Sequence, residues 1–395
     1  MAQGSHDAAH SAVGYQHQTW WALVELLRSG PERPDSSLTL EMYDDIAWDA
    51  SGTPTELLQI KHHQGNTRRL TDRAMDVWKT IQVWMDHSSP TDISGPSLVL
   101  VTTQTAAPGS AMALLRADDR NEASALAILE SVAAEEGADD TRKTRQQFLA
   151  LEASARRTFV HRMRVADGSP HAEDVHAAAR TALQWTLPPG HEELFMAMVW
   201  KWWDGQALAL LQGRLASLDV GSAQAAIAEI RDQFTSENLP TLVHLADVDE
   251  AEISEQHRTR PFVQQMEWVA YPPRNLQKAI VDYYRAYAQA VQWVDEDLIG
   301  IAELERFEAE LVDEWEREFE WMTEGLDEGA DEKAKQAAGR SLLRTLLGQT
   351  GITVRSRYND PFFARGHRHA LADSGRVGWH ADFEDRINQL LHVHA

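Results

Sequence analysis

The spacing of apolar residues predicts a mixture of helices and strands in the first part of the chain. Apolar positions recur with helical period over residues 11–28, and the run ends at a Gly-Pro pair. Two strand-like stretches follow at 37–48 and 55–63, separated by the turn sequence SGTP. Helical period returns over 72–86, and the continuous apolar run SLVLVTT occupies 97–103. The predicted order is helix, strand, strand, helix, strand.

The pattern changes after this opening α/β unit, which is predicted to span residues 1–115. Residues 116–250 are rich in Ala, Leu, Glu, Gln and Arg and lack strand-like runs, which predicts a helical middle region. A charged connection then leads into residues 251–395, which are again mainly helical. There, residues 301–322 place apolar side chains on one helix face and glutamates elsewhere. The glutamate row indicates a solvated face, with a partner-binding surface as the alternative.

Composition places the chain among globular proteins and restricts its chemistry. It is 43% hydrophobic and 25% charged, and no apolar run approaches the roughly 18 residues of a membrane span. The N-terminus lacks the basic and apolar segments of a signal peptide, so a cytoplasmic protein without a membrane segment is expected. The absence of cysteine excludes disulfides, thiolate zinc sites and cysteine nucleophiles.

The charge balance is strongly acidic. The chain carries 37 Lys and Arg against 61 Asp and Glu, a formal net charge of −24. A uniform field of that sign repels nucleic acid. If this protein binds DNA, it therefore needs a local basic patch, a metal ion or partner subunits.

Acidic and amide groups gather on one face of the hairpin predicted at residues 37–63. Because side chains alternate between the two faces of a strand, Glu41 and Asp45 share a face in the first strand. Gln59 and Lys61 share a face in the second strand. The same alternation points Asp44 away from Asp45 unless the strand bulges. Such groups are expensive to place near a core unless they bind a metal or perform chemistry.

This set of four side chains is what metal-assisted phosphodiester hydrolysis requires. Hard oxygen ligands hold Mg²⁺ or Mn²⁺, which polarises the phosphoryl group and activates a water. A lysine beside the ion stabilises developing negative charge or orients that water. Our hypothesis assigns Asp45, Gln59 and Glu41 to the metal and Lys61 to the water. On the pattern alone, an amphipathic hairpin with its charged face in water is the alternative.

Positive or protonatable groups follow the second predicted strand. His62 and His63 end it, and Arg68 and Arg69 come after a short loop. In an acidic protein, such a local cluster predicts contact with a phosphate backbone.

Conspicuous histidines and tryptophans elsewhere in the chain are assigned structural roles. The histidines of GHRHALAD and LHVHA have no cysteine or nearby acid pattern that would complete a zinc site, so a structural or surface role is expected for them. His380 in VGWHADF is expected to fix local packing. The tryptophans of WKWWDG, residues 200–205, are expected to pack between helices, with a binding patch as the alternative.

Five ordered stretches over about the first 100 residues resemble one known domain. GYQHQTWWALVELL resembles its opening helix, with Tyr15 at the first aromatic place, His17 where a second aromatic is usual, and Gln18 at the helix glutamine. EMYDDI looks like its acidic strand, with Asp45 at the metal-ligand position, and LLQIKHH looks like its Gln-x-Lys strand. LTDRAMDVWKTIQVW and LVLVTTQTAAPGSAMALLR resemble the helix and the strand and loop that follow. The domain is the PD-(D/E)XK double-stranded-DNA endonuclease domain of bacterial anti-phage effectors, the Cap-type nuclease.

That resemblance implies a restriction-endonuclease-like α/β core and a Mg²⁺-dependent endodeoxyribonuclease acting on double-stranded DNA. Gln59 departs from the commoner form of the motif, which has a second acid at this place. Because a neutral amide binds a divalent ion less strongly than a carboxylate, Glu41 or Gln18 would complete the shell, and the choice between them stays open.

The C-terminal region carries a second resemblance, in the stretches WVAYPPRNLQKAIVDYYRAYAQAVQWV, LVDEWER, AGRSLL, RGHRHALAD and VGWHADF. They resemble the C-terminal domain of effectors in ABC three-component defence systems, which include Lamassu-type systems. The resemblance implies an SMC-like ATPase partner, a small helical bridging subunit, and a nuclease that is silent until it is released or oligomerises. The chain lacks GxxxxGK[ST], so nucleotide hydrolysis is expected to belong to another subunit.

Two function classes follow from these observations. The first is a metal-dependent DNA endonuclease effector of a multi-subunit defence complex, favoured by the intact Asp45, Gln59 and Lys61. The second is a non-catalytic adaptor or scaffold of the same kind of complex, favoured by the acidic charge of the isolated chain. In either case, residues from about 260 onward are expected to dock onto the partners.

Overall fold

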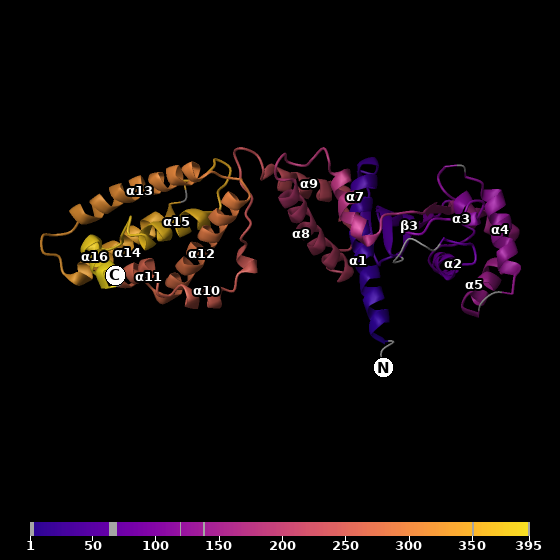
Figure 1. Cartoon of the computed structure of the whole chain (residues 1–395), viewed down its shortest axis with the longest axis horizontal. Helices are drawn as coiled ribbons and strands as arrows, with labels where there is room; N and C mark the ends of the chain where they lie inside the picture. Colours follow the sequence, from indigo (N-terminus) through magenta and orange to yellow (C-terminus); the bar gives the residue numbers. More distant parts are fainter. Residues whose placement is uncertain (1–3, 63–68, 119, 137–138, 350, 394–395) are drawn as a thin grey trace. The chain divides into compact units, whose positions relative to one another are not determined.

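The chain divides into two compact units in this computed structural model, Met1–Glu229 and Ile230–Ala395 (Figure 1). The first unit combines a sheet with helices and the second is helical, so the predicted mixed α/β class is confirmed. The structure describes residues 4–62, 69–118, 120–136, 139–349 and 351–393.

A six-stranded mixed sheet forms the centre of the first unit. Its strands are β1 (Ser37–Leu40), β2 (Ile46–Ala50), β3 (Thr53–Lys61), β4 (Ser97–Thr102), β5 (Met163–Ala166) and β6 (Leu218–Asp219). They lie in the order β5-β4-β3-β2-β1-β6, with β3, β4 and β5 parallel and the other neighbours antiparallel. Because β2 runs against β3, the start of β2 lies at the same edge as the ends of β3 and β4.

Helices cover both faces of this sheet. They are α1 (Gly4–Ser29), η1 (Gly30–Glu32), α2 (Met75–His87), α3 (Ala111–Leu114), α4 (Glu122–Ala134), α5 (Asp139–Ala150), α6 (Ala153–Arg162), η2 (Ala172–Asp174), α7 (Val175–Ala182), α8 (Glu192–Leu211) and α9 (Val220–Asp232). On one face, Leu57 and Leu100 of the sheet share a buried core with Trp78 and Trp84 of α2. On the other, the Trp48 indole donates to Glu25 of α1 at 2.9 Å. Figure 1 shows α1 and α7 on one side of β3 and α2 to α5 on the other.

The hairpin around residue 52 was predicted correctly. Ser51 and Gly52 both have positive φ, 56° and 85°, which is the backbone of the tight turns that join twisted antiparallel strands. Glycine adopts this conformation without steric cost. The predicted helix at 72–86 and strand at 97–103 are also confirmed, as α2 and β4.

The single strand predicted over residues 37–48 is wrong. The chain forms β1 and β2, which pair with each other and are joined by a bend at residues 41–45. Glu41 has φ +54°, and its backbone N donates to the Asp45 carbonyl at 3.2 Å, which closes the bend. Met42, expected on the apolar face, is 54% exposed. The alternation of apolar residues continues through the bend, so sequence periodicity gave no sign of the reversal.

The expectation that residues 116–250 lack strands is also wrong. Both β5 and β6 lie in this region and occupy the two edges of the sheet. β5 has four residues and β6 has two, too few for a periodic pattern to appear. The region is otherwise helical, as predicted.

The second unit is built from helices around a buried one. Its elements are η3 (Leu245–Asp247), α10 (Glu250–Gln256), α11 (Pro261–Trp268), α12 (Pro273–Asp295), α13 (Ile301–Glu324), α14 (Glu332–Gly348), α15 (Pro361–Asp373) and α16 (Phe383–Val393). α15 is buried along most of its length and packs closely on α12 at Gly366. α13 buries Phe307, Leu311 and Trp315, the face predicted from sequence. Among the described helices, none is long and apolar enough to span a membrane.

Candidate metal-binding site

Asp45 lies where the bend at residues 41–45 enters β2. Its Oδ2 accepts a hydrogen bond of 2.7 Å from the backbone N of Ile60 on β3. Ile60 stands between Gln59 and Lys61, so the Asp45 carboxylate meets β3 within the segment that carries both predicted partners. No described residue donates a hydrogen bond to the second oxygen, Oδ1. Asp45 is therefore anchored through one oxygen and presents the other.

Gln59 and Lys61 occupy the same side of β3. Leu57, which shares their parity, packs into the core formed with α2, so both side chains belong to the α2 side of the sheet. Gln59 is 4% exposed and Lys61 is partly buried at the end of the strand. The chain thus places an amide and an ammonium group two residues apart on the strand whose backbone anchors Asp45.

Gln18 links α1 to the bend at residues 41–45. Its Nε2 donates to Glu41 Oε1 at 2.7 Å and to the backbone oxygen of Asp45 at 3.0 Å. Gln18 is 7% exposed, whereas Glu41 is exposed. The Gln18 amide thus holds the backbone that presents Asp45, and its predicted supporting role at a metal site stays a prediction.

Glu41 does not reach the site through strand alternation, because the chain bends at this residue. Its carboxylate is held by Gln18 of α1, and α1 covers the face of the sheet opposite α2. The alternation that grouped Glu41 with Asp45, Gln59 and Lys61 was therefore the wrong reason to place it there. A contribution of Glu41 to a metal shell stays a prediction.

Strand alternation predicted that the side chain of Asp44 points away from that of Asp45. Its buried carboxylate accepts hydrogen bonds from the backbone N of Asp45, at 2.9 Å, and from the Trp84 indole of α2, at 3.2 Å. Burial and, to a smaller extent, the charge of Asp45 raise the pKa of Asp44 to about 7, against the lowering effects of its two hydrogen bonds and of Lys61. The adjacent acids Asp44 and Asp45 were the sequence feature from which a role for Asp44 beside Asp45 could have been predicted.

The groups predicted to contact a phosphate backbone are only partly described. Arg69 is exposed, while His63 and Arg68 lie outside the described residues. The His62 ring lies 4.5 Å from the ring of His17 and 6.2 Å from that of His171, and its Nε2 accepts from the backbone N of Ala172 at 3.4 Å. His62 therefore belongs to a histidine cluster at the end of β3.

His17 is the buried member of this cluster. Its Nε2 lies 3.0 Å from the carbonyl oxygen of Pro170, where it donates a hydrogen bond, and burial lowers its pKa. The His17 ring contacts two others: its centroid lies 6.4 Å from that of Trp21 and 4.5 Å from that of His62.

A divalent ion fits the chemistry of the residues around Asp45. The anchored carboxylate of Asp45, the carboxylate of Asp44, whose pKa is raised by burial and by the charge of Asp45, and the amide of Gln59 offer the hard oxygen atoms that Mg²⁺ prefers. A bound cation would relieve the repulsion between Asp44 and Asp45.

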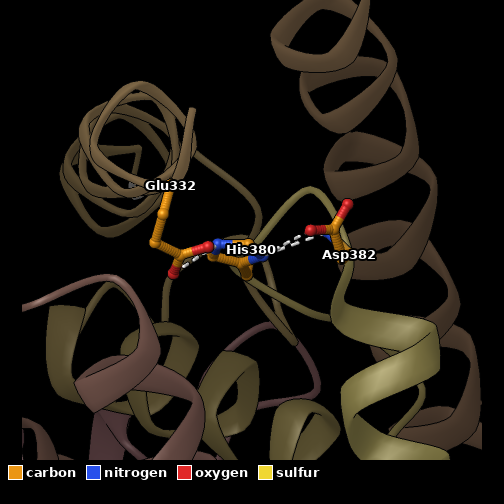
Figure 2. Close-up of side chains that lie close together, drawn as sticks. All are labelled: Glu332, His380 and Asp382. Carbon is orange, nitrogen blue, oxygen red and sulfur yellow. Dashed lines mark hydrogen bonds and ion pairs between the residues drawn. The ribbon is translucent and has the colours of Figure 1, made fainter. Parts of the chain in front are cut away.

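A different group of acid and imidazole side chains stands close enough to share one ion. It consists of Glu332, His380 and Asp382 in the second unit, the single group of this kind within the described ranges. Figure 2 shows the imidazole between the two carboxylates. His380 Nδ1 accepts from the backbone N of Asp382 at 3.1 Å, and its Nε2 lies 3.4 Å from Glu332 Oε1. The two ring nitrogens thus face different carboxylates.

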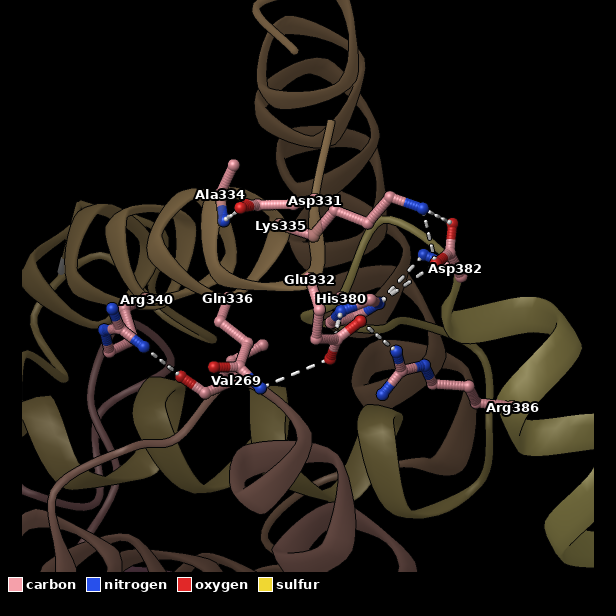
Figure 3. Close-up of polar contacts among 10 residues, drawn as sticks. All are labelled: Val269, Asp331, Glu332, Ala334, Lys335, Gln336, Arg340, His380, Asp382 and Arg386. Atoms are coloured by element: carbon pink, nitrogen blue, oxygen red, sulfur yellow. Dashed lines mark hydrogen bonds and ion pairs between the residues drawn. The ribbon is translucent and has the colours of Figure 1, made fainter. Parts of the chain in front are cut away.

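Both carboxylates of this group already hold cations, as Figure 3 shows. Lys335 Nζ bonds both oxygens of Asp382, at 2.9 and 2.8 Å, and Arg386 bonds Glu332 at 2.7 Å. Burial and Arg386 lower the pKa of His380, which keeps the ring neutral and Nδ1 an acceptor. A metal ion would have to displace two cations, so the group is an ion-pair cluster that joins α14, α16 and the turn between α15 and α16.

Three more of the histidines and tryptophans singled out in the sequence are buried in the fold, namely His367, His369 and Trp203. His367 and His369 are buried on α15, and burial lowers the pKa of His369 to about 3. Trp203 is fully buried and its indole donates to the Thr19 carbonyl of α1 at 2.8 Å. The predicted packing role of the tryptophan-rich segment is confirmed for this residue.

Comparison with known proteins gives one family match. Residues 262–387 match the family model of C-terminal domain 7 of the ABC-three component (ABC-3C) systems. The match lies within the second unit, from α11 to α16. It supports membership of the chain in such a system, as the C-terminal resemblance implied. No curated protein matches the chain significantly.

Proposed function

We propose that the chain is the metal-dependent DNA endonuclease effector subunit of an ABC three-component, Lamassu-like anti-phage complex. In this proposal it hydrolyses phosphodiester bonds of double-stranded DNA once partner subunits activate it. The observation that carries the proposal is the anchoring of Asp45 on the β3 backbone between Gln59 and Lys61. The acid therefore contacts β3 within the short segment that carries the amide and the lysine, which supports this assignment.

The order of elements supports a restriction-endonuclease-like core. α1 precedes the antiparallel strands β1, β2 and β3; α2 then crosses to β4, which is parallel to β3. This topology brings the start of β2, with Asp45, to the edge where β3 ends at Lys61. Sequence resemblance over the same elements points to the same family of nucleases.

Each residue then has a stated role. Asp45 would hold Mg²⁺ or Mn²⁺ at the edge of the sheet, with the amide oxygen of Gln59 on the α2 side and Glu41 on the α1 side. When bound, the ion supplies Lewis acidity and an activated water. Lys61 orients that water or stabilises charge on the phosphoryl oxygens. Gln18 positions Asp45 through its backbone oxygen. Asp44 adds negative charge beside the ion.

Partner subunits would allow this acidic chain to act on DNA, which it would otherwise repel. The family match supports a multi-component system, and we propose an SMC-like ATPase and a small helical bridging subunit as the partners in the cytoplasm. They would deliver DNA, or assemble several copies of the chain so that catalytic faces and basic groups such as Arg69 act together.

Plasmid cleavage tests this function directly. Purified protein is incubated with linear and circular plasmid in Mg²⁺, Mn²⁺ or EDTA, alone and with the ATPase and bridging subunits. Cleavage should require the metal, and Lys61→Ala should lower its rate by at least about a hundredfold. Lys79→Ala, on an exposed position of α2, is the matched control and should cleave like the wild type. Equal cleavage by Lys61→Ala would refute the site.

The alternative is a non-catalytic adaptor, and the net charge of −24 favours it for the isolated chain. It predicts no metal-dependent cleavage even with all partners and DNA ends present, together with normal assembly of the complex. That combination of results would refute the nuclease proposal and support the adaptor.

A further inference from the structure

A cavity of about 700 Å³ opens between α7 and α8 in the first unit. Its size lies within the range of roughly 300 to 1,000 Å³ typical of small-molecule sites. The cavity is separate from the residues around Asp45. Gln18, which contacts that site, and Trp20, which stands behind the cavity, are two residues apart on α1. They therefore point about 200° apart around the helix axis.

Aromatic rings form one wall of the cavity. The ring of His176 lies on that of Trp200, with centroids 4.2 Å apart and planes inclined by 37°. Trp20 of α1 meets both rings edge-on, at 4.8 and 6.2 Å, and so supports the pair from behind. Trp200 is 9% exposed while His176 is exposed, so the pair presents a supported π-surface to the cavity.

Charged groups of both signs stand around these rings. Arg180 of α7 and Glu193 of α8 form an ion pair across the cavity. Lys201 and Asp204 lie on the exposed face of α8, and burial raises the pKa of Asp204 while His176 lowers it. Although the chain has far more acids than bases, two cationic side chains, Arg180 and Lys201, line this cavity beside the aromatic surface.

We propose that this cavity binds a nucleotide, with its base on the His176–Trp200 pair and its phosphate on Lys201 and Arg180. Planar bases stack on aromatic side chains, and phosphate makes charge-assisted bonds to lysine and arginine. Glu193 and Asp204 then accept hydrogen bonds from the amino and hydroxyl groups of the base and sugar. A simple anion would leave the rings unused and would meet two carboxylates.

The nucleotide has two sources, a free mononucleotide or one residue of a DNA strand. Isothermal titration calorimetry of the full chain with ATP, with dAMP and with a 12-residue oligothymidylate separates them. Binding of ATP or dAMP indicates a free nucleotide, and binding of the oligonucleotide alone indicates a strand.

Two variants assign the binding to the cavity. Lys201→Glu reverses a cation at the exposed rim, and Ala197→Trp fills the cavity from an exposed position of α8, so neither removes a buried side chain. Each should weaken binding about tenfold or more. Lys79→Glu makes the same charge change on α2 and should leave affinity unchanged.

Circular dichroism of each variant checks that the fold is retained. Absence of binding by all three probes would overturn the proposal, as would equal affinity in Lys201→Glu, Ala197→Trp and the wild type. Neither result bears on cleavage, which is measured separately.

Discussion

Two adjacent carboxylates in the candidate site have different surroundings. Asp45 is anchored by the backbone of Ile60, whereas Asp44 is buried against Trp84 of α2. The pKa of Asp44, about 7, exceeds its ordinary value of 3.8, so folding takes up a proton at this residue between those pH values. The contribution of Asp44 to the free energy of unfolding therefore falls as pH rises from about 3.8 to about 7. A cation near both carboxylates would offset that loss.

Metal affinity should depend on pH through Asp44. Above a pH of about 7 the Asp44 carboxylate is ionised and attracts a divalent ion; below it, the ion must displace a proton. Ca²⁺ affinity, measured by calorimetry without turnover, should fall up to about tenfold per pH unit below 7. Asp44→Asn should bind less tightly at pH 8 and change little with pH. Equal wild-type affinity at pH 6 and pH 8 would show that Asp44 does not face the ion.

At the scale of elements, a few contacts between helices and strands decide what each local sequence becomes. The bend at residues 41–45 is held by Gln18 of α1, and α15 approaches α12 so closely that only glycine fits at residue 366. A Cβ on Gly366 would lie 2.1 Å from the Asp282 carbonyl oxygen and 2.4 Å from Ala286 Cβ. Close packing at this point therefore fixes the spacing of the two helices.

Substitution of Gly366 tests that packing. Gly366→Ala should lower the free energy of unfolding by roughly 3 kcal/mol, because the backbone of α12 must shift to admit the methyl group. Gly348→Ala is the control: this glycine ends α14, is exposed, and has nothing within 4 Å of an added Cβ. It should be neutral or stabilising by up to about 1 kcal/mol. Urea unfolding of both variants measures the difference, and equal stabilities would contradict the close approach.

At the scale of the whole molecule, the chain separates a mixed α/β unit from a helical unit that carries the family match. The candidate metal-binding residues all lie in Met1–Glu229, and the matched residues 262–387 all lie in Ile230–Ala395. Under the proposed function, catalysis belongs to the first unit and partner binding to the second. The acidic charge of the chain is compatible with this division if partners bring the DNA.

The two units should be separable by function. We expect a fragment of residues 230–395 to fold with a helical circular dichroism spectrum and to co-purify with the ATPase and bridging subunits. A fragment of residues 1–229 should fold and fail to co-purify. If residues 1–229 alone retained the partners, the docking surface would lie in the first unit, and its assignment to the second unit would be refuted.

Several features of this protein followed from sequence alone because they depend on short-range order. Helical spacing predicted α2, the Ser51-Gly52 turn predicted the β2–β3 hairpin, and the run SLVLVTT predicted β4. The acid pair and the Gln-x-Lys segment were also visible, since each lies within a few residues. The C-terminal resemblance was confirmed by the family match at residues 262–387.

Other features were decided only by the tertiary structure, because their causes lie far apart in the chain. The bend at residues 41–45 depends on Gln18, 23 residues before Glu41, and the burial of Asp44 depends on Trp84, 40 residues after it. β6 becomes a strand by pairing with β1, across about 180 residues. The cavity between α7 and α8 is likewise backed by Trp20 of α1. No local pattern records such contacts, because each forms only when distant segments meet.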